Sequence, residues 1–207
     1  MQTIGHADVV RMIRAAAALI HANEQQLSAL DAATGDGDHG TTICKVMDAA
    51  VAATQTDTGS ISELLGKVGW DVICVDGGSA PPLLGSFFTG MGEGATGKAE
   101  LDVPALSAAL QAGVTAMREH SKAQIGDKTM MDALLPAVAA CAGKTPSEAL
   151  RAAAEAAARG ADATKDMTAK FGRARNLGDR TKGHQDPGAT SVSLIFQAFA
   201  NAVNERK

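Results

Sequence analysis

Apolar residues recur at intervals of three and four along most of this chain, a pattern typical of amphipathic helices. In the stretch 7–30, Val9, Ile13 and Ile20 fall on one helical face. The only run typical of a strand, Val72-Ile-Cys-Val75, lies at the end of a helical pattern. Aromatic residues make up only 3% of the chain, so the core must be built from Ala, Leu, Val, Ile and Met, which suits closely packed helices. We therefore predict an all-α fold.

Glycine and proline divide the chain into about seven or eight helices. The expected helices span 7–30, 41–51, 61–75, 83–88, 103–120, 130–142, 146–168 and 189–204. Between them we predict a flexible glycine-rich loop over 89–98 and a long polar loop over 171–188. Alternate loops of an antiparallel arrangement meet at one end. We expect one domain, 1–207, as a helical bundle or barrel with a shared site at one end.

Composition excludes several classes of protein. The 207 residues are 45% hydrophobic and 20% charged, as in folded globular proteins, and the net charge of −4 argues against nucleic-acid binding. No apolar stretch is long enough to cross a membrane, and no signal-peptide pattern opens the chain. The three cysteines, Cys44, Cys74 and Cys141, lie far apart among apolar residues, so we predict buried free thiols and a cytoplasmic protein.

Three carboxylates and a histidine crowd into the segment 31–42. Asp31, Asp36 and Asp38 are hard oxygen ligands that suit Mg²⁺, and three of them suit two ions on a di- or triphosphate. The alternative is a solvated Asp/Gly turn. An EF-hand is excluded because its later ligand positions would be Gly40 and Met47. Gly40-Thr41-Thr42 opens a helix whose N–H groups favour a phosphate, although either threonine could simply cap it.

Three further loops carry polar residues and glycine. Asp76-Gly-Gly-Ser79-Ala80 is either an anion nest or a common turn. In 126–132, Thr129 is a candidate helix cap and Met130 an apolar surface for an adenine ring; the alternative is a core methionine beside a solvated Asp127 and Lys128. The segment 172–190 is basic, and its Arg173 could contact a phosphate. No P-loop, Rossmann fingerprint or Ser-His-Asp set is present.

These four motifs, in this order, resemble the nucleotide-binding L subunit of dihydroxyacetone kinase, the DhaL family. The matching pieces are Gly35-Asp-Gly-Asp-His-Gly40, Gly77-Gly-Ser79, Gly126-Asp-Lys-Thr-Met130 and Gly183-His-Gln-Asp-Pro-Gly-Ala-Thr-Ser191. The resemblance implies an eight-helix antiparallel barrel with a nucleotide at one end. It also implies that Asp31, Asp36 and Asp38 hold two Mg²⁺ ions on the phosphates of ADP or ATP.

The family's nucleotide contacts fall on defined positions of this sequence. They are His39, Gly40, Thr41, Thr42, Gly78, Ser79, Ala80, Ser121, Thr129, Met130, Arg173, Asp186, Pro187 and Gly188. Arg173 is the expected catalytic residue, and we find no strong candidate for a general base. Three departures leave the substrate open: Pro81 and Pro82 replace a small residue or glycine, Thr42 replaces a frequent asparagine, and Ser121 a frequent glycine.

The resemblance implies a phosphotransferase with a partner. The ketose is expected on a separate K subunit, with dihydroxyacetone or another short ketose such as erythrulose as substrate. The donor is either exchangeable ATP or a phosphotransferase-system protein that rephosphorylates bound ADP. Alternatives are an ADP-loaded module that signals to a transcription regulator, and a phosphohydrolase. We also expect a homodimer and no nucleic-acid or membrane partner.

Overall fold

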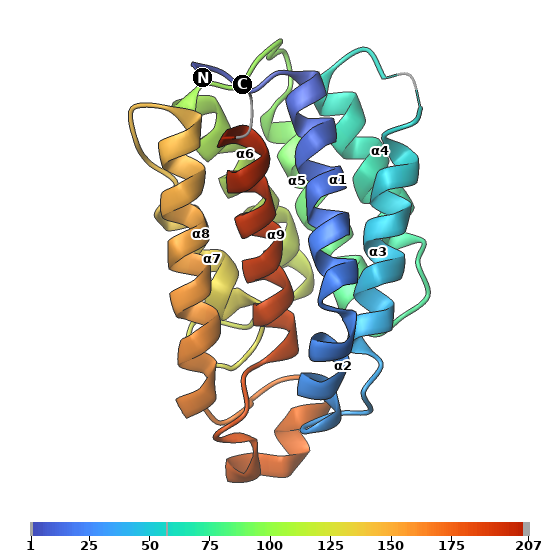
Figure 1. Ribbon diagram of the computed structural model, residues 1–207, viewed down its shortest axis with the longest axis vertical. Helices are drawn as coiled ribbons and strands as arrows, with labels where there is room; N and C mark the ends of the chain where they lie inside the picture. The colour runs from blue at the N-terminus through green and yellow to red at the C-terminus, as the bar shows by residue number, and fades with distance from the viewer. Residues whose placement is uncertain (1, 57, 205–207) are drawn as a thin grey trace.

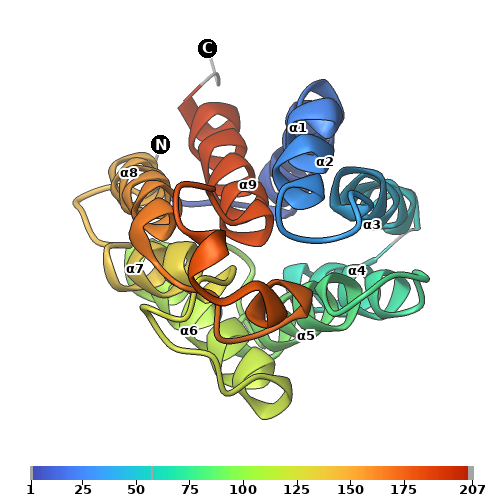
Figure 2. The same ribbon diagram turned by 90° about the horizontal axis from the view of Figure 1, so that it is seen from below.

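Eight of the described helices pack side by side in a closed antiparallel ring (Figures 1 and 2). The computed structural model describes residues 2–56 and 58–204. Its helices are α1 (His6–Ala22), α2 (Glu24–Ala32), α3 (His39–Ala53), α4 (Ile61–Ile73), α5 (Ala80–Gly94), α6 (Val103–His120), α7 (Met131–Ala139), α8 (Pro146–Ala163) and α9 (Pro187–Asn204). Each ring helix contacts the next in chain order, with α3 following α1, and α9 closes the ring against α1. The short α2 extends from the end of α1 and lies beside α3.

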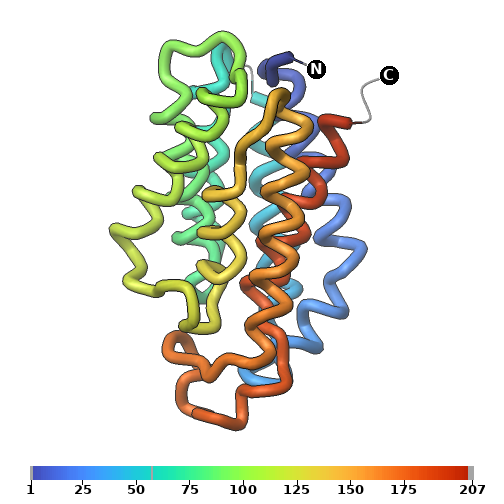
Figure 3. Tube along the Cα trace, turned by 90° about the vertical axis from the view of Figure 1, so that its left-hand side faces the viewer, coloured from blue at the N-terminus to red at the C-terminus, as the bar shows by residue number. Residues whose placement is uncertain are grey.

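The prediction of an all-α fold is confirmed. Within the described ranges, the extended backbone pairing is limited to one isolated antiparallel bridge between Ile4 and Leu101. No helix of these ranges combines the length and apolar character that crossing a membrane requires. The segment between α8 and α9 contains two 3₁₀ turns, Thr164–Asp166 and Arg173–Thr181. This segment lies across one end of the ring (Figures 2 and 3), and we call that end the site end.

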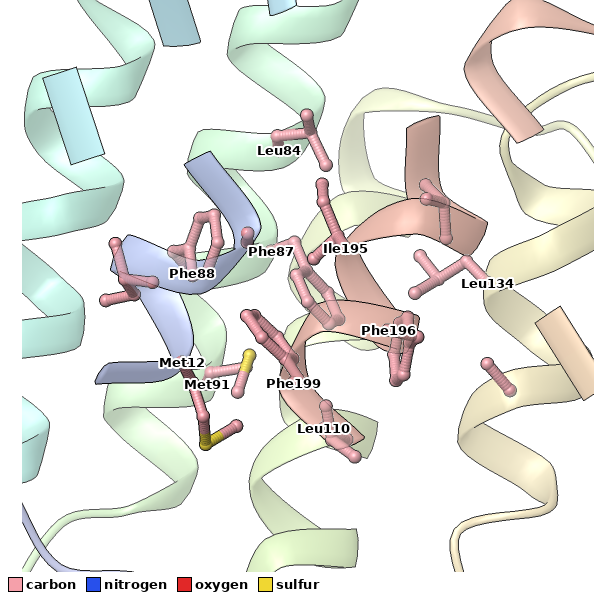
Figure 4. Close-up of a cluster of buried hydrophobic side chains, with 14 of the residues drawn as sticks. Met12, Leu84, Phe87, Phe88, Met91, Leu110, Leu134, Ile195, Phe196 and Phe199 are labelled. Carbon is pink, nitrogen blue, oxygen red and sulfur yellow. The ribbon is translucent and has the colours of Figure 1, made fainter. Parts of the chain in front are cut away.

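The interior of the ring is filled by aliphatic, methionine and phenylalanine side chains. Figure 4 shows Met12 of α1, Phe87 and Met91 of α5, and Phe196 and Phe199 of α9 converging on one cluster. All five are buried. The few aromatic residues of the chain therefore sit mainly at the centre, where their large area contributes most to the hydrophobic stabilisation.

Three of the helices that begin at the end opposite the site, α4, α6 and α8, have side-chain caps at their N-cap residues. Ser60 accepts a hydrogen bond from the Glu63 amide at 3.2 Å at the start of α4. Asp102 does the same for α6 and Thr145 for α8. Each cap satisfies an amide that the helix itself leaves unpaired and stabilises the protein by about 1 kcal/mol. Thus the sequence specifies these three helix starts locally.

The prediction of a flexible glycine-rich loop over 89–98 is wrong. Helix α5 continues to Gly94, well past the predicted end at Phe88. A Cβ atom on Gly90 would lie 2.6 Å from the carbonyl oxygen of Ala112, and one on Gly94 would lie 2.8 Å from the Cα of Ala109, both on α6. The glycines therefore allow α5 and α6 to pack closely, and the free energy of this packing outweighs their low intrinsic helix propensity.

The predicted helix over 7–30 is interrupted at Asn23. The side chain of Asn23 donates a hydrogen bond to the Leu19 carbonyl at 2.7 Å and so competes with the next turn of the helix. Other predicted helix ends are corrected by a few residues, as α4, α7 and α8 end at Ile73, Ala139 and Ala163.

The cysteine prediction is also partly wrong. Cys44 and Cys141 are buried, but Cys74 is exposed because α4 ends just before it.

We predict that Gly85→Ala destabilises the fold. A Cβ atom there would lie 2.7 Å from the Gly69 carbonyl oxygen and 2.9 Å from the Ile73 amide nitrogen, both on the backbone of α4. Separating the two helices should lower the free energy of unfolding by about 1–3 kcal/mol, measurable by urea denaturation.

Gly66→Ala in α4 is the matched control for Gly85→Ala. No described heavy atom lies within 4 Å of its Cβ position, so it should stabilise by up to about 1 kcal/mol through helix propensity. Equal effects of the two substitutions would contradict close packing as the reason for the glycine.

Candidate nucleotide and metal site

Four helices begin at the site end and surround a cavity of about 830 Å³. They are α3, α5, α7 and α9, which alternate with helices of opposite direction around the ring. The cavity is lined by the first residues of each of the four, such as His39, Ala80, Met131 and Pro187. Because the N-terminus of a helix carries a partial positive charge, their convergence favours an anion. The volume is in the range of small-molecule sites.

The aspartate loop forms one wall of this cavity. Oxygen atoms of Asp31, Asp36 and Asp38 all lie within 4.8 Å of one another. Asp31 is at the end of α2, and its carboxylate accepts a hydrogen bond from the His39 amide at 3.2 Å. Gly37 has φ +80°, a conformation that favours glycine, and Gly35 leaves no room for a side chain beside Asp31. The sequence thus folds this loop so that three carboxylates point at one place.

Hard carboxylate oxygens at this spacing fit Mg²⁺. Mg²⁺ is usually held by one or two carboxylates together with water and phosphate oxygens. Among the described residues, Arg173 is the cation that contacts the cluster: its guanidinium pairs with Asp36 and lies 3.9 Å from Asp38. Arg173 is well exposed, so these pairs contribute little to stability. The ion pairs with Asp36 and Asp38 instead position the Arg173 side chain at the cavity.

Helices α3 and α5 begin differently from the helices of the opposite end. Their N-cap residues, Asp38 and Ser79, are types that cap helices well. Within the described part of the chain, however, neither side chain makes a capping hydrogen bond, and both residues have helical backbone angles. In the first turn of α3 the His39 amide donates to Asp31, and in that of α5 Pro81 and Pro82 have no amide hydrogen. Among the described residues the Ala80 amide is left without a side-chain acceptor beside the cavity, where it can donate to an anion.

His39 connects two of the helix starts. Its ring nitrogen Nε2 lies 3.2 Å from the Ser191 hydroxyl of α9, which donates to the Gly188 carbonyl at 3.0 Å. Burial lowers the pKa of His39, although Asp31 acts in the opposite direction. A neutral imidazole is therefore favoured, and it fixes α3 against the start of α9.

Lys128 holds the other side of the cavity together. It is 3% exposed and has a positive φ of 58°, which is unusual for a side chain of this size. Its ammonium group donates to the Thr164 carbonyl at 2.5 Å and to the His184 carbonyl, near the two ends of the segment between α8 and α9. Burial lowers the pKa of Lys128, while the nearby carboxylates of Asp186, Asp132 and Asp166 raise it.

Acidic side chains near Lys128 close the first turns of α7 and α9. Asp132 accepts from the amides of Gly126 and Thr129 at 2.6 and 2.7 Å, and Asp186 accepts from the amide of Ala189 at 2.7 Å. Burial raises the pKa of Asp186 to about 7, and Asp132 adds to that rise.

Most of the predicted site residues meet at the cavity. It is lined by Asp31, Asp36, Asp38, His39, Thr42, Gly78, Ser79, Ala80, Ser121, Thr129, Met130, Arg173, Asp186, Pro187 and Gly188. Gly40 and Thr41 lie outside this lining. Gly40 packs against the backbone of α2, and the Thr41 hydroxyl donates to Glu24 at 3.1 Å.

The sequence prediction missed several lining residues, notably His120, Lys122, Lys128 and Phe171. Lys128 lies within the motif Gly126-Asp-Lys-Thr-Met130, but nothing in the sequence reveals that its side chain is buried or that its φ is positive. The alternative in which Asp127 and Lys128 are solvated is not what the structure has, since both are buried.

Comparison with known proteins identifies the family of this chain. Residues 33–201 match the DAK2 domain. The chain belongs to the DAK2-domain family. This DAK2-domain protein is 36% identical, over 189 residues, to the ADP-binding subunit DhaL of PEP-dependent dihydroxyacetone kinase 2 from Listeria innocua. The alignment covers 88% of each of the two chains. It is 31% identical to the corresponding DhaL subunit of Escherichia coli, over 98% of this chain and 100% of that protein.

A solved structure of dihydroxyacetone kinase has the same fold as this DAK2-domain protein. The dihydroxyacetone kinase from C. freundii, in complex with AMP-PNP and Mg²⁺, superposes with a TM-score of 0.76 and 29% identity. The match covers 97% of this chain but 35% of that one, so the present chain spans about a third of the solved kinase. The resemblance to the DhaL family is therefore confirmed.

We predict that Asp186 makes stability fall between about pH 4 and pH 7. The pKa of Asp186 is about 7 in the folded protein, against an ordinary value of 3.8, so the folded state holds a proton that the unfolded state has lost in this range. The contribution is present below the unfolded pKa and is lost as pH rises through the folded pKa.

Asp186→Asn keeps a hydrogen-bond acceptor for Ala189 but removes this titration. Unfolding free energies measured by denaturant from pH 4 to 8 should therefore decline more steeply for the natural protein than for the variant. The exposed Asp162→Asn is the control and should parallel the natural protein. Parallel profiles for Asp186→Asn would contradict the prediction.

Proposed function

We propose that this chain is the nucleotide-binding subunit of a dihydroxyacetone kinase, which transfers a phosphoryl group from a magnesium nucleotide to a short ketose held by a partner K subunit. The observation that carries the proposal is the convergence of three carboxylates and the starts of four helices on one cavity. The names of the DhaL relatives, as ADP-binding subunits, and the AMP-PNP and Mg²⁺ complex of the C. freundii kinase support it.

In this proposal the two ends of the nucleotide contact different walls of the cavity. Asp31, Asp36 and Asp38 would hold two Mg²⁺ ions, which neutralise phosphate oxygens when bound. The start of α3 with the Thr42 hydroxyl, and the amides of Gly78, Ser79 and Ala80 ahead of Pro81, would donate to the phosphates. Thr129, Met130, Ser121 and the turn Asp186–Gly188 lie across the cavity, where Met130 offers an apolar surface for the adenine.

Arg173 is the proposed catalytic residue. Its guanidinium pairs with Asp36, and exchange of that carboxylate for a phosphate oxygen would keep it within the same cavity. There it would stabilise the charge that spreads over the transferred group. The role of this chain is thus to position the donor, while the acceptor hydroxyl belongs to the ketose and the K subunit would take up its proton.

The phosphoryl donor and the quaternary structure are further parts of the proposal. The relatives from Listeria innocua and Escherichia coli are named PEP-dependent, which supports rephosphorylation of bound ADP by a phosphotransferase-system protein over exchange of free ATP. The expected homodimer and the cytoplasmic location stay predictions.

We predict that Asp36→Asn weakens magnesium-dependent ADP binding. Loss of one carboxylate ligand should lower the affinity by more than about tenfold in calorimetric titrations at saturating Mg²⁺. Asp162→Asn on α8 removes the same charge from the exposed surface and should leave the affinity unchanged. ADP affinity that is equal in the two variants would refute the metal assignment.

We further predict that transfer needs the K subunit. Purified protein with bound MgADP, mixed with K subunit, dihydroxyacetone, phosphoenolpyruvate and phosphotransferase-system proteins, should form ketose phosphate in step with pyruvate, as followed by coupled absorbance. Arg173→Ala should lower the rate by about a hundredfold or more, whereas Arg159→Ala on the exposed face of α8 should not change it. Steady nucleotide hydrolysis without K subunit would instead favour a phosphohydrolase, and binding of ADP without transfer would favour a signalling module.

A further inference from the structure

A second cluster of metal-binding side chains lies outside the cavity, where α1, α2 and α3 meet. It consists of His21 in the last turn of α1, Glu24 in the first turn of α2, and Cys44 of α3, whose ligand atoms lie within 4.8 Å of one another. We propose that these three residues bind a divalent transition-metal ion such as Zn²⁺, at a site separate from the aspartate loop.

The donor set selects the class of metal. A thiolate sulfur, an imidazole nitrogen and a carboxylate oxygen together suit Zn²⁺ or Co²⁺, whereas Mg²⁺ takes oxygen ligands. Ligands of a tetrahedral zinc ion lie about 3.5 Å apart, so ligand atoms that lie within 4.8 Å of one another need to approach by about 1.3 Å at most. The exposed His21 and the long side chain of Glu24 can supply this movement, while the buried Cys44 stays in place.

Asp48 completes the surroundings of the cluster. Its carboxylate lies 2.7 Å from Nε2 of His21, one helical turn beyond Cys44 on α3. Such a carboxylate holds one nitrogen of a metal-binding imidazole and orients the other toward the ion. An ordinary surface ion pair would also explain the contact between His21 and Asp48, and such a pair contributes little to the stability of the fold. It does not account for the buried thiol that faces the same point.

Charge around Cys44 also favours a cation. Burial, together with the carboxylates of Glu24 and Asp48, raises the pKa of the Cys44 thiol to about 11. The two acidic side chains therefore surround the sulfur with negative charge. When a divalent ion binds, the sulfur–metal bond forms as the thiol proton passes to solvent, and the ion compensates both carboxylates.

A metal here would fix the position of α2. This helix is separated from α1 by the break at Asn23 and has Leu27 as its one buried residue in the described structure. Glu24 lies about 10 Å along the helix axis from Asp31, at a rise of 1.5 Å per residue. An ion bound by His21, Glu24 and Cys44 would join α2 to α1 and α3, and so would steady the helix that carries Asp31.

Cobalt(II) titration of the whole protein tests the site, with saturating Mg²⁺ present to occupy the aspartate loop. We expect one equivalent of Co²⁺ to give the near-ultraviolet charge-transfer absorption of a cobalt–thiolate bond. Cys44→Ser should abolish this band, and Cys141→Ser, the matched buried cysteine, should keep it. Absence of the band in the natural protein, or its persistence in Cys44→Ser, would overturn the proposal.

His21→Ala and Glu24→Gln serve as variants that do not disturb the buried thiol. Each should weaken Co²⁺ binding by more than about tenfold, as measured from the same band. Each protein's thermal unfolding is recorded without metal, so that a change in fold is distinguished from loss of a ligand. Unchanged affinity in both variants would refute the assigned ligands even if a cobalt–thiolate band were present.

Discussion

The antiparallel alternation of the ring is the constraint on which the site depends. Because neighbouring helices run in opposite directions, α3, α5, α7 and α9 begin at the same end, and their dipoles add there. A cluster of carboxylates would be repelled elsewhere on a protein of net charge −4, but here it faces four positive helix ends. At this end of the ring, the helix starts therefore favour a bound anion and the three carboxylates favour bound cations.

The side of the cavity formed by α7 and α9 is organised by buried charge. Lys128 reaches carbonyls near both ends of the segment between α8 and α9, and Asp127 holds the middle of that segment through Lys170 at 2.7 Å. The side chain of Lys170 also holds the pKa of Asp127 below its usual range. A long segment with little core of its own is thus fastened at three points to the loop before α7. This attachment gives a polar segment a defined path over the cavity.

The sequence predicts the parts of this structure that depend on local rules. Helical periodicity points to the all-α fold, and the close spacing of Asp31, Asp36 and Asp38 points to their meeting. Prediction from the sequence fails where contacts with residues far along the chain determine the local structure. Gly90 and Gly94 have a low helix propensity, yet they lie in a helix because α6 comes within contact of them. Lys128 has no local signal of burial, since its partners are 36 and 56 residues away. The Asn23 break depends on a side-chain hydrogen bond that competes with the helix.

The unequal capping of the two ends also has a thermodynamic meaning. Three of the helices that start opposite the site are capped by side chains of the protein itself, namely Ser60, Asp102 and Thr145. At the starts of α3 and α5 the N-cap side chains make no such hydrogen bond within the described structure, so an anion that enters the cavity can take their place. Such an anion acts as a removable helix cap, and mass action then makes the stability of the ring rise with its concentration. Supply of the ligand would therefore influence how long the protein survives proteolysis in the cell, independently of any catalytic turnover.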